Sequence, residues 1–115
     1  MVTVTIKHDP TNRELCIEAK GHAGYGKRGE DIVCASVSIL MYTLEQAVYA
    51  LHESGGLSGE HEMRSFFDDG IASVACKCSA PEAHAEAKKI YSTIESGFLL
   101  LSENYPQYVR LEAYT

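Results

Sequence analysis

The sequence predicts an α+β fold in two layers, in the order β-β-α-β-β-α-β, with two helices packed on one face of a largely antiparallel sheet. Two observations support this class. Segments of alternating apolar and polar residues come in pairs joined by turn sequences, which is typical of hairpins. Two longer segments each carry a single apolar stripe at helical spacing, and such helices need a sheet face to cover. The 115 residues suffice for one domain, which we expect over 1–115.

The first hairpin is expected over residues 2–7 and 14–20. Val2, Val4 and Ile6 alternate with polar residues, as in a half-buried strand. The stretch 9–12 reads Asp-Pro-Thr-Asn, which is turn chemistry. Alternation resumes in the second strand, and residues 21–30 then form a glycine-rich loop.

A long helix is expected from about Ile32 to Ser54, where Gly55 and Gly56 end it. Its apolar residues recur every three or four positions: Val33, Val37, Leu40, Leu44, Val48 and Leu51.

The second half of the chain repeats the pattern. Residues 58–67 and 70–78 read as a hairpin around Asp68, Asp69 and Gly70. A second helix starts after Pro81, and the tail over 108–114 alternates as a last short strand. The stripe of that second helix consists of Ala83, Ala87, Ile90, Ile94, Phe98 and Leu101.

Composition excludes several classes of function. Lys and Arg total 10 and Asp and Glu total 16, so the formal net charge is −6. This charge argues against direct nucleic-acid binding and favours a basic partner or none. The N-terminus lacks signal-peptide features and no apolar run approaches ~18 residues, so we expect a cytoplasmic protein with no membrane contact. The four cysteines are too few for a disulfide scaffold.

The end of the loop and the start of the helix place a thiol where an anion is favoured. Asp31 is a candidate N-cap, which puts Cys34 in the first helical turn. Helix N-termini favour thiolates, and His22 lies at the other end of the loop, so the two can form an ion pair and shuttle a proton. Ser38 follows Cys34 by one turn and can line a pocket. Backbone N–H groups here, including that of Cys34, are candidates for an oxyanion hole.

Each of these residues also has a structural interpretation. Cys34 can be core filler, and Asp31 can cap the helix without taking part in catalysis. The window from Gly24 to Gly29 also matches G-x-G-x-x-G and contains Lys27 and Arg28, which suggests a phosphate- or nucleotide-binding module. Against that reading, the preceding strand belongs to a hairpin and the chain is short for a dinucleotide fold.

No metal and no cofactor are expected. Cys76 and Cys78 form a C-x-C pair without a second pair at ligand spacing, and both would face the core beside Val74. Cys16 falls on the other face of its strand. The remaining histidines lie in polar surroundings and are expected at the surface: His8, His52, His61 and His84.

The window from Gly21 to Ser38 resembles the signature of the ribosomal-processing cysteine proteases, the Prp family of Firmicutes and related bacteria. The matching residues are Gly21, His22, Ala23, Gly26, Gly29, Asp31, Ile32, Val33, Cys34, Ala35, Val37 and Ser38. The motif is long and its spacing is rigid.

This resemblance implies a cysteine endopeptidase acting by acyl transfer, with Cys34 and His22 as catalytic residues and Asp31 and Ser38 in support. It implies removal of a short N-terminal extension, ending in an apolar, aromatic-containing stretch, from large-subunit ribosomal protein twenty-seven of the bacterial set. It also implies a homodimer and a mobile loop that admits substrate, comprising Gly21, Gly24, Tyr25, Gly26 and Gly29. A ribosome-assembly factor that binds the same basic protein without cutting it is the other alternative.

Overall fold

A computed structural model describes residues 1–114 of the chain. Within this range the chain forms five strands and two helices in the predicted order. The elements are β1 (Val2–Asp9), β2 (Glu14–Lys20), α1 (Ile32–Glu53), β3 (His61–Asp68), β4 (Ile71–Cys78), α2 (Pro81–Asn104) and β5 (Val109–Tyr114).

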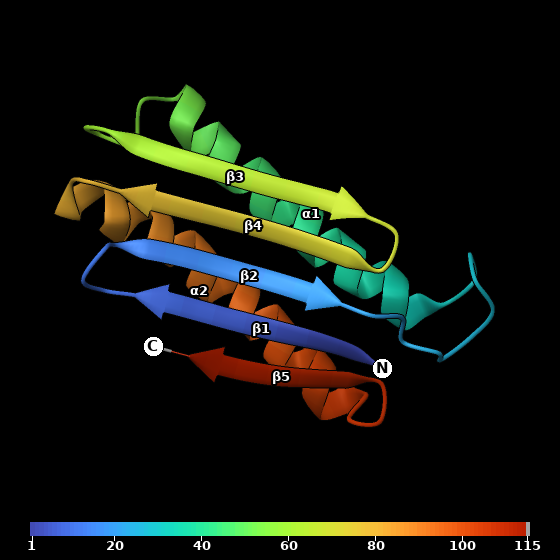
Figure 1. Ribbon diagram of the computed structural model, residues 1–115. Helices are drawn as coiled ribbons and strands as arrows, with labels where there is room; N and C mark the ends of the chain where they lie inside the picture. The colour runs from blue at the N-terminus through green and yellow to red at the C-terminus, as the bar shows by residue number, and fades with distance from the viewer. Residues whose placement is uncertain (115) are drawn as a thin grey trace.

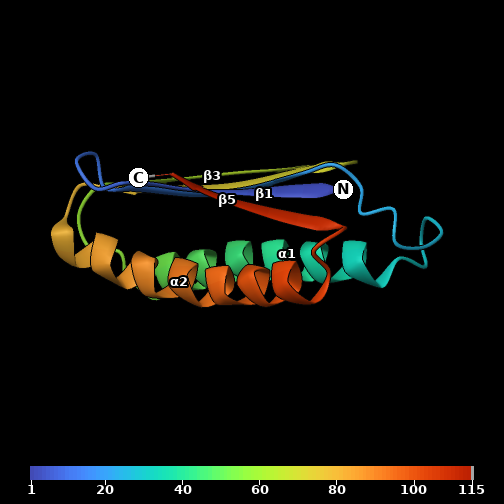
Figure 2. The same cartoon turned by 90° about the horizontal axis from the view of Figure 1, so that it is seen from below.

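The strands form one mixed sheet with the order β3-β4-β2-β1-β5. The pairs β3–β4, β4–β2 and β2–β1 are antiparallel, whereas β5 runs parallel to β1. Both helices cover the same face, and the other face is open (Figures 1 and 2). The predicted fold class is therefore confirmed. The parallel pair arises because α2 carries the chain back along the sheet before β5 begins.

The apolar stripes of both helices pack on the sheet, with one shifted position in each. In α1 the sequence predicts Leu40 in the buried stripe, but Met41 is buried at this turn and Leu40 is only partly buried. Leu40 instead packs against Gly97 of α2 and fills the contact between the helices. The contact is close, since a Cβ at Gly97 would lie 2.7 Å from Leu40 Cδ2. In α2, Tyr91 replaces the predicted Ile90 in the core.

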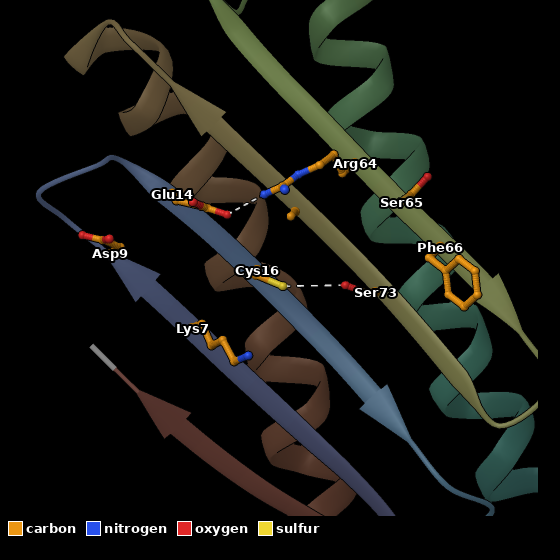
Figure 3. Close-up of a pocket in the computed structure, with 9 residues that line it drawn as sticks. Lys7, Asp9, Glu14, Cys16, Arg64, Ser65, Phe66 and Ser73 are labelled. Carbon is orange, nitrogen blue, oxygen red and sulfur yellow. Dashed lines mark hydrogen bonds and ion pairs between the residues drawn. The ribbon is translucent and has the colours of Figure 1, made fainter.

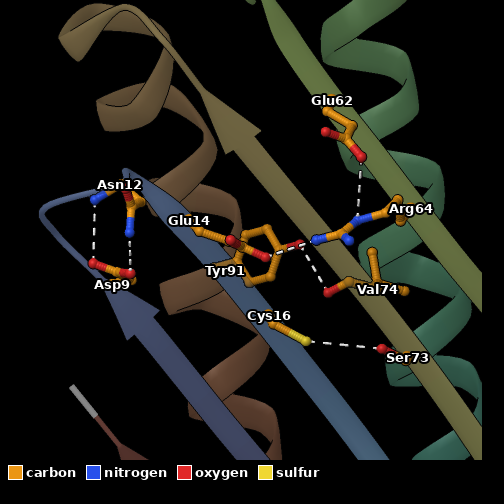
Figure 4. Close-up of polar contacts among 9 residues, drawn as sticks. All are labelled: Asp9, Asn12, Glu14, Cys16, Glu62, Arg64, Ser73, Val74 and Tyr91. Atoms are coloured by element: carbon orange, nitrogen blue, oxygen red, sulfur yellow. Dashed lines mark hydrogen bonds and ion pairs between the residues drawn. The ribbon is translucent and has the colours of Figure 1, made fainter.

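Tyr91 can occupy this core position because its hydroxyl has a partner. The side chain is 1% exposed and its hydroxyl donates to the carbonyl of Val74 on β4 at 3.0 Å (Figure 4). Burial raises the pKa of the Tyr91 phenol above its usual range. The pairing leaves the phenol oxygen satisfied inside the core.

The helix α1 is long and apolar enough to cross a membrane by length and composition, with a mean hydropathy of 1.4. Polar residues interrupt the helix, so the sequence contains no continuous apolar run of this length. Five residues of α1 are buried in the core against the sheet. Large apolar side chains are exposed elsewhere on the helix: Ile32, Ile39, Tyr42 and Tyr49.

Candidate active site

The glycine-rich loop, the first turn of α1 and the β3–β4 turn lie at the same end of the sheet (Figure 1). Together they line an open cleft of about 660 Å³. The cleft brings together most of the residues selected from the sequence: Gly21, His22, Gly24, Gly26, Gly29, Asp31, Cys34 and Ser38. Residues 22 and 34 therefore face one cavity although a loop separates them in the chain.

Asp31 organises both the loop and the helix start. One carboxylate oxygen accepts from the backbone N–H groups of Val33 at 2.9 Å and Cys34 at 3.0 Å. The other accepts from those of Tyr25 at 2.9 Å and Gly26 at 3.0 Å. These bonds, chiefly the one from Cys34, hold the pKa of Asp31 below its usual range. The carboxylate caps α1 and ties down the loop, and its hydrogen bonds all go to backbone.

Cys34 is half-buried at the third position of α1. Its sulfur accepts the backbone N–H of Ala23 at 3.3 Å. Ala23 is 3% exposed and follows His22 directly, so this contact joins the end of β2 to the start of α1. An N–H donor and the positive end of a helix dipole both stabilise negative charge on the sulfur.

His22 is held at the exit of β2 by its backbone. The N–H of Gly21 donates to the carbonyl of Gly70 at 2.8 Å, and the N-terminal ammonium of Met1 donates to the carbonyl of His22 at 2.6 Å. Gly21 has φ +103°, a conformation that favours glycine. The imidazole is exposed and points to the β3–β4 turn, where its Nε2 lies 3.8 Å from Oδ1 of Asp69.

Sequence reasoning missed Asp69. The sequence assigns it only to a hairpin turn, because nothing in local spacing links positions 22 and 69.

The β3–β4 turn also contributes to the cleft wall, where Phe67 stacks on Tyr42 of α1 with ring centroids 4.3 Å apart. This stacked pair gives the cleft an apolar side.

The structure contradicts the prediction that the backbone N–H of Cys34 contributes to an oxyanion hole. The N–H of Cys34 donates to Asp31 Oδ1, and the N–H of Ala35 donates to the Asp31 carbonyl at 3.0 Å. These amides are engaged in capping and in the first helical turn, so they are not available to a developing oxyanion. Ser38, exposed in the cleft one turn below Cys34, remains a hydroxyl donor within the cavity.

Tyr25 lies in the loop but not among the residues that line the cleft. Its ring packs edge-on against Tyr105 and Tyr108, with centroids 5.5 and 5.1 Å apart. These contacts anchor the loop to the segment before β5. The structure therefore supports an anchoring position for Tyr25 in this state of the loop.

The other cysteines lie away from the cleft. Cys76 and Cys78 are buried with their sulfurs 3.8 Å apart, and burial raises the pKa of the Cys76 thiol to about 12. Over residues 1–114, no three His, Cys, Asp or Glu side chains gather as they would around a metal ion. The predicted surface histidines form two pairs, His8 with His84 and His52 with His61.

A second hollow of about 500 Å³ lies on the open face of the sheet (Figure 3). It contains Cys16, whose sulfur lies 3.8 Å from the hydroxyl of Ser73, and an ion pair between Arg64 and Glu14 at 2.8 Å. Burial raises the pKa of the Cys16 thiol. No histidine is among its lining residues, so this hollow lacks the base that the first cleft has.

An open cleft with a thiol at a helix N-terminus and an imidazole at a strand end is the arrangement of a cysteine-dependent hydrolase. The family model of cysteine protease Prp matches residues 1–110 of the chain. The chain belongs to this family and is a cysteine protease.

Solved structures agree with this assignment at the level of the fold. An essential ribosomal processing protease Prp from S. aureus, in complex with a covalently linked product peptide, superposes with a TM-score of 0.74 at 24% identity, covering 99% of this chain and 100% of that one. SMU.848 from Streptococcus mutans has a TM-score of 0.67 at 27% identity, covering 100% of this chain and 95% of that one. A search of curated proteins finds no match.

Proposed function

We propose that this protease removes the N-terminal extension of large-subunit ribosomal protein twenty-seven by acyl transfer through Cys34 and His22. The observation that carries the proposal is the bond from the Ala23 amide to the Cys34 sulfur, which places the strand end bearing His22 against the thiol. The S. aureus relative in complex with a substrate peptide, and with a covalently linked product peptide, supports peptide cleavage of this kind.

The proposed reaction uses the two groups in turn. The Cys34 thiolate attacks the carbonyl carbon of the scissile bond, and the His22 imidazolium gives its proton to the leaving amine. The extension is then held on Cys34 as a thioester, while the mature protein leaves with a free N-terminus. Neutral His22 takes a proton from water, the hydroxide attacks the thioester, and the extension leaves as a carboxylic acid.

The surroundings of the cleft fit a peptide substrate with apolar residues. The stacked Tyr42 and Phe67 form an apolar wall of the cleft. The net charge of −6 suits encounter with a basic ribosomal protein, because opposite charges speed association. We place this reaction in the cytoplasm, where the ribosomal protein would be met before assembly.

A phosphate- or nucleotide-binding module has less support. A phosphate at a helix N-terminus is bound by free backbone N–H groups. Here the carboxylate of Asp31 already accepts from the amides of Tyr25, Gly26, Val33 and Cys34. An anionic side chain thus occupies the place that a phosphate would need.

We also propose that the protein forms a homodimer. The helical layer has no element covering its outer side (Figure 2). Large apolar side chains of the two helices are exposed, including Ile39, Leu99 and Leu100. Exposed apolar residues of this size are typical of association surfaces. Sedimentation of the protein at micromolar concentration tests this, and a mass of one chain would contradict it.

The substrate assignment is tested by mass spectrometry of three proteins after incubation with the enzyme. They are the extended ribosomal protein, its mature form, and the same protein with the extension residues in scrambled order. We expect one cut, at the end of the natural extension only. Absence of this cut, or equal cleavage of the scrambled extension, would contradict the proposed substrate.

A further inference from the structure

A carboxylate outside the sequence motif faces the ring of His22. Oδ1 of Asp69, in the β3–β4 turn, lies 3.8 Å from His22 Nε2. We propose that Asp69 is a positioning residue, which orients the imidazole of His22 for proton transfer with Cys34. This inference rests on the proposed function, in which His22 carries the proton.

The β3–β4 turn is shaped to receive the ring. The Gly70 carbonyl accepts the N–H of Gly21 at 2.8 Å, which fixes the strand end beside the turn. Gly70 has φ +74°, and a Cβ there would lie 3.0 Å from His22 Nε2. The missing side chain at Gly70 therefore lets the imidazole lie against the turn, within reach of Asp69.

The side chain of Asp69 is held in place from the other side. Its Oδ2 accepts from the guanidinium of Arg28, on the glycine-rich loop, at 2.6 Å. Oδ1 faces the ring of His22, so the two oxygens of the carboxylate have different partners. One carboxylate thus links the glycine-rich loop with the histidine at the cleft.

The two nitrogens of the ring then have separate tasks. A carboxylate facing Nε2 favours the neutral tautomer with the proton on Nε2, since that N–H can donate to it. Nδ1 is left with its lone pair for the thiol of Cys34. When the ring becomes an imidazolium, the same carboxylate stabilises its charge. The separation of 3.8 Å is longer than a hydrogen bond, and rotation of the exposed imidazole closes it in the free enzyme.

Histidine NMR tests this without substrate, so the result does not depend on whether the proposed substrate is correct. Long-range ¹H–¹⁵N spectra are recorded at a pH where the rings are neutral, and His22→Ala identifies the His22 signals. We expect Nε2–H in the wild type and in Asp69→Asn, whose amide oxygen still accepts. In Asp69→Ala the signals should move toward the mixture of tautomers of a solvent-exposed imidazole. Unchanged His22 signals in Asp69→Ala would overturn the proposal.

Kinetics on any peptide that the wild type cleaves give the second measurement. We expect Asp69→Ala to lower kcat roughly 10- to 100-fold with KM within about twofold, because proton transfer by a positioned base contributes ~10²- to 10⁴-fold. Asp69→Asn should recover part of kcat. Circular dichroism shows whether each variant is folded. A loss confined to KM would contradict a role in orienting His22.

Arg28→Ala is the matched control, since it removes the other partner of Asp69 and leaves the carboxylate facing His22. Its guanidinium side chain is 81% exposed, so the variant should fold normally. We expect the His22 tautomer to be retained and kcat to fall less than in Asp69→Ala. An equal loss of kcat and of tautomer in Arg28→Ala would show that Asp69 acts by holding the loop, which would overturn the proposal.

Discussion

Replacing Gly21 with alanine tests how the end of β2 presents His22. Gly21 has φ +103°, and an added Cβ would collide with the backbone carbonyl oxygen of Met1. That collision involves backbone on both sides, so a side-chain rotation cannot relieve it. The ammonium of Met1 also holds the carbonyl of His22 at 2.6 Å. The substitution should therefore displace His22 as well as strain the chain.

The expected loss of stability in Gly21→Ala has two parts, the backbone strain at positive φ and the collision with Met1. A non-glycine residue in such a backbone region costs on the order of 1–3 kcal/mol, and we expect the collision to bring the total to roughly 2–4 kcal/mol. At about 4 °C per kcal/mol for a chain of this size, Tm should fall by roughly 8–16 °C. Gly55→Ala is the control, because Gly55 has φ +78° with nothing within 4 Å of the added Cβ. It should cost only about 1 kcal/mol.

Urea unfolding measures both free energies, and peptide cleavage measures the effect on catalysis. We expect Gly21→Ala to lower kcat at least tenfold, as for a displaced proton-transfer group, and Gly55→Ala to leave it unchanged. Equal destabilisation by the two substitutions would refute the collision with Met1. Wild-type kcat in a folded Gly21→Ala protein would refute the link between this backbone and His22.

Three further predictions follow from the cap, the core and the cleft wall. Asp31→Ala should abolish activity, measured as peptide cleavage, because it frees the loop and the helix start. Since the folded-state pKa of Asp31 is lowered, the carboxylate stabilises the fold above pH ~4 and loses this effect as pH falls. In Asp31→Asn the free energy of unfolding should therefore fall less steeply as the pH is lowered. Tyr91→Phe should cost about 1 kcal/mol through its lost bond to Val74, measured in urea. Because the folded-state pKa of Tyr91 is raised, its contribution to the free energy of unfolding is present below pH ~10 and is lost above it, at up to about 1.4 kcal/mol per pH unit. The stability of Tyr91→Phe should therefore depend less on alkaline pH. Tyr42→Ala removes the ring stacked on Phe67 and should raise KM roughly tenfold with little change in kcat in steady-state assays.

The order of elements was predictable because each has a local periodicity. Alternation marks β1 and β2, and recurring apolar positions mark α1 and α2, so the two-layer α+β class follows. The exact core position within a helix was less predictable. Leu40 and Met41 both fit the helical repeat after Val37, and only the contact with Gly97 directs Leu40 toward the other helix.

The candidate site was predictable where its chemistry is local. Asp31 and Cys34 are three residues apart, so the cap and the first-turn thiol could be expected together. The approach of Asp69 to His22 could not, because it depends on the pairing of β4 with β2 and on the turn between β3 and β4. From the sequence the Cys34 amide could serve either the cap or an oxyanion hole, and in the structure it donates to Asp31.

The most direct test of the central claim is intact-protein mass spectrometry of wild type and Cys34→Ala, quenched in acid during turnover of an extended substrate. We predict that wild type shows an adduct with the mass of the extension minus water, located on Cys34 and released by hydroxylamine. Cys34→Ala should show no adduct and no cleavage. Cleavage by Cys34→Ala, or an adduct on Cys16, Cys76 or Cys78, would contradict the account.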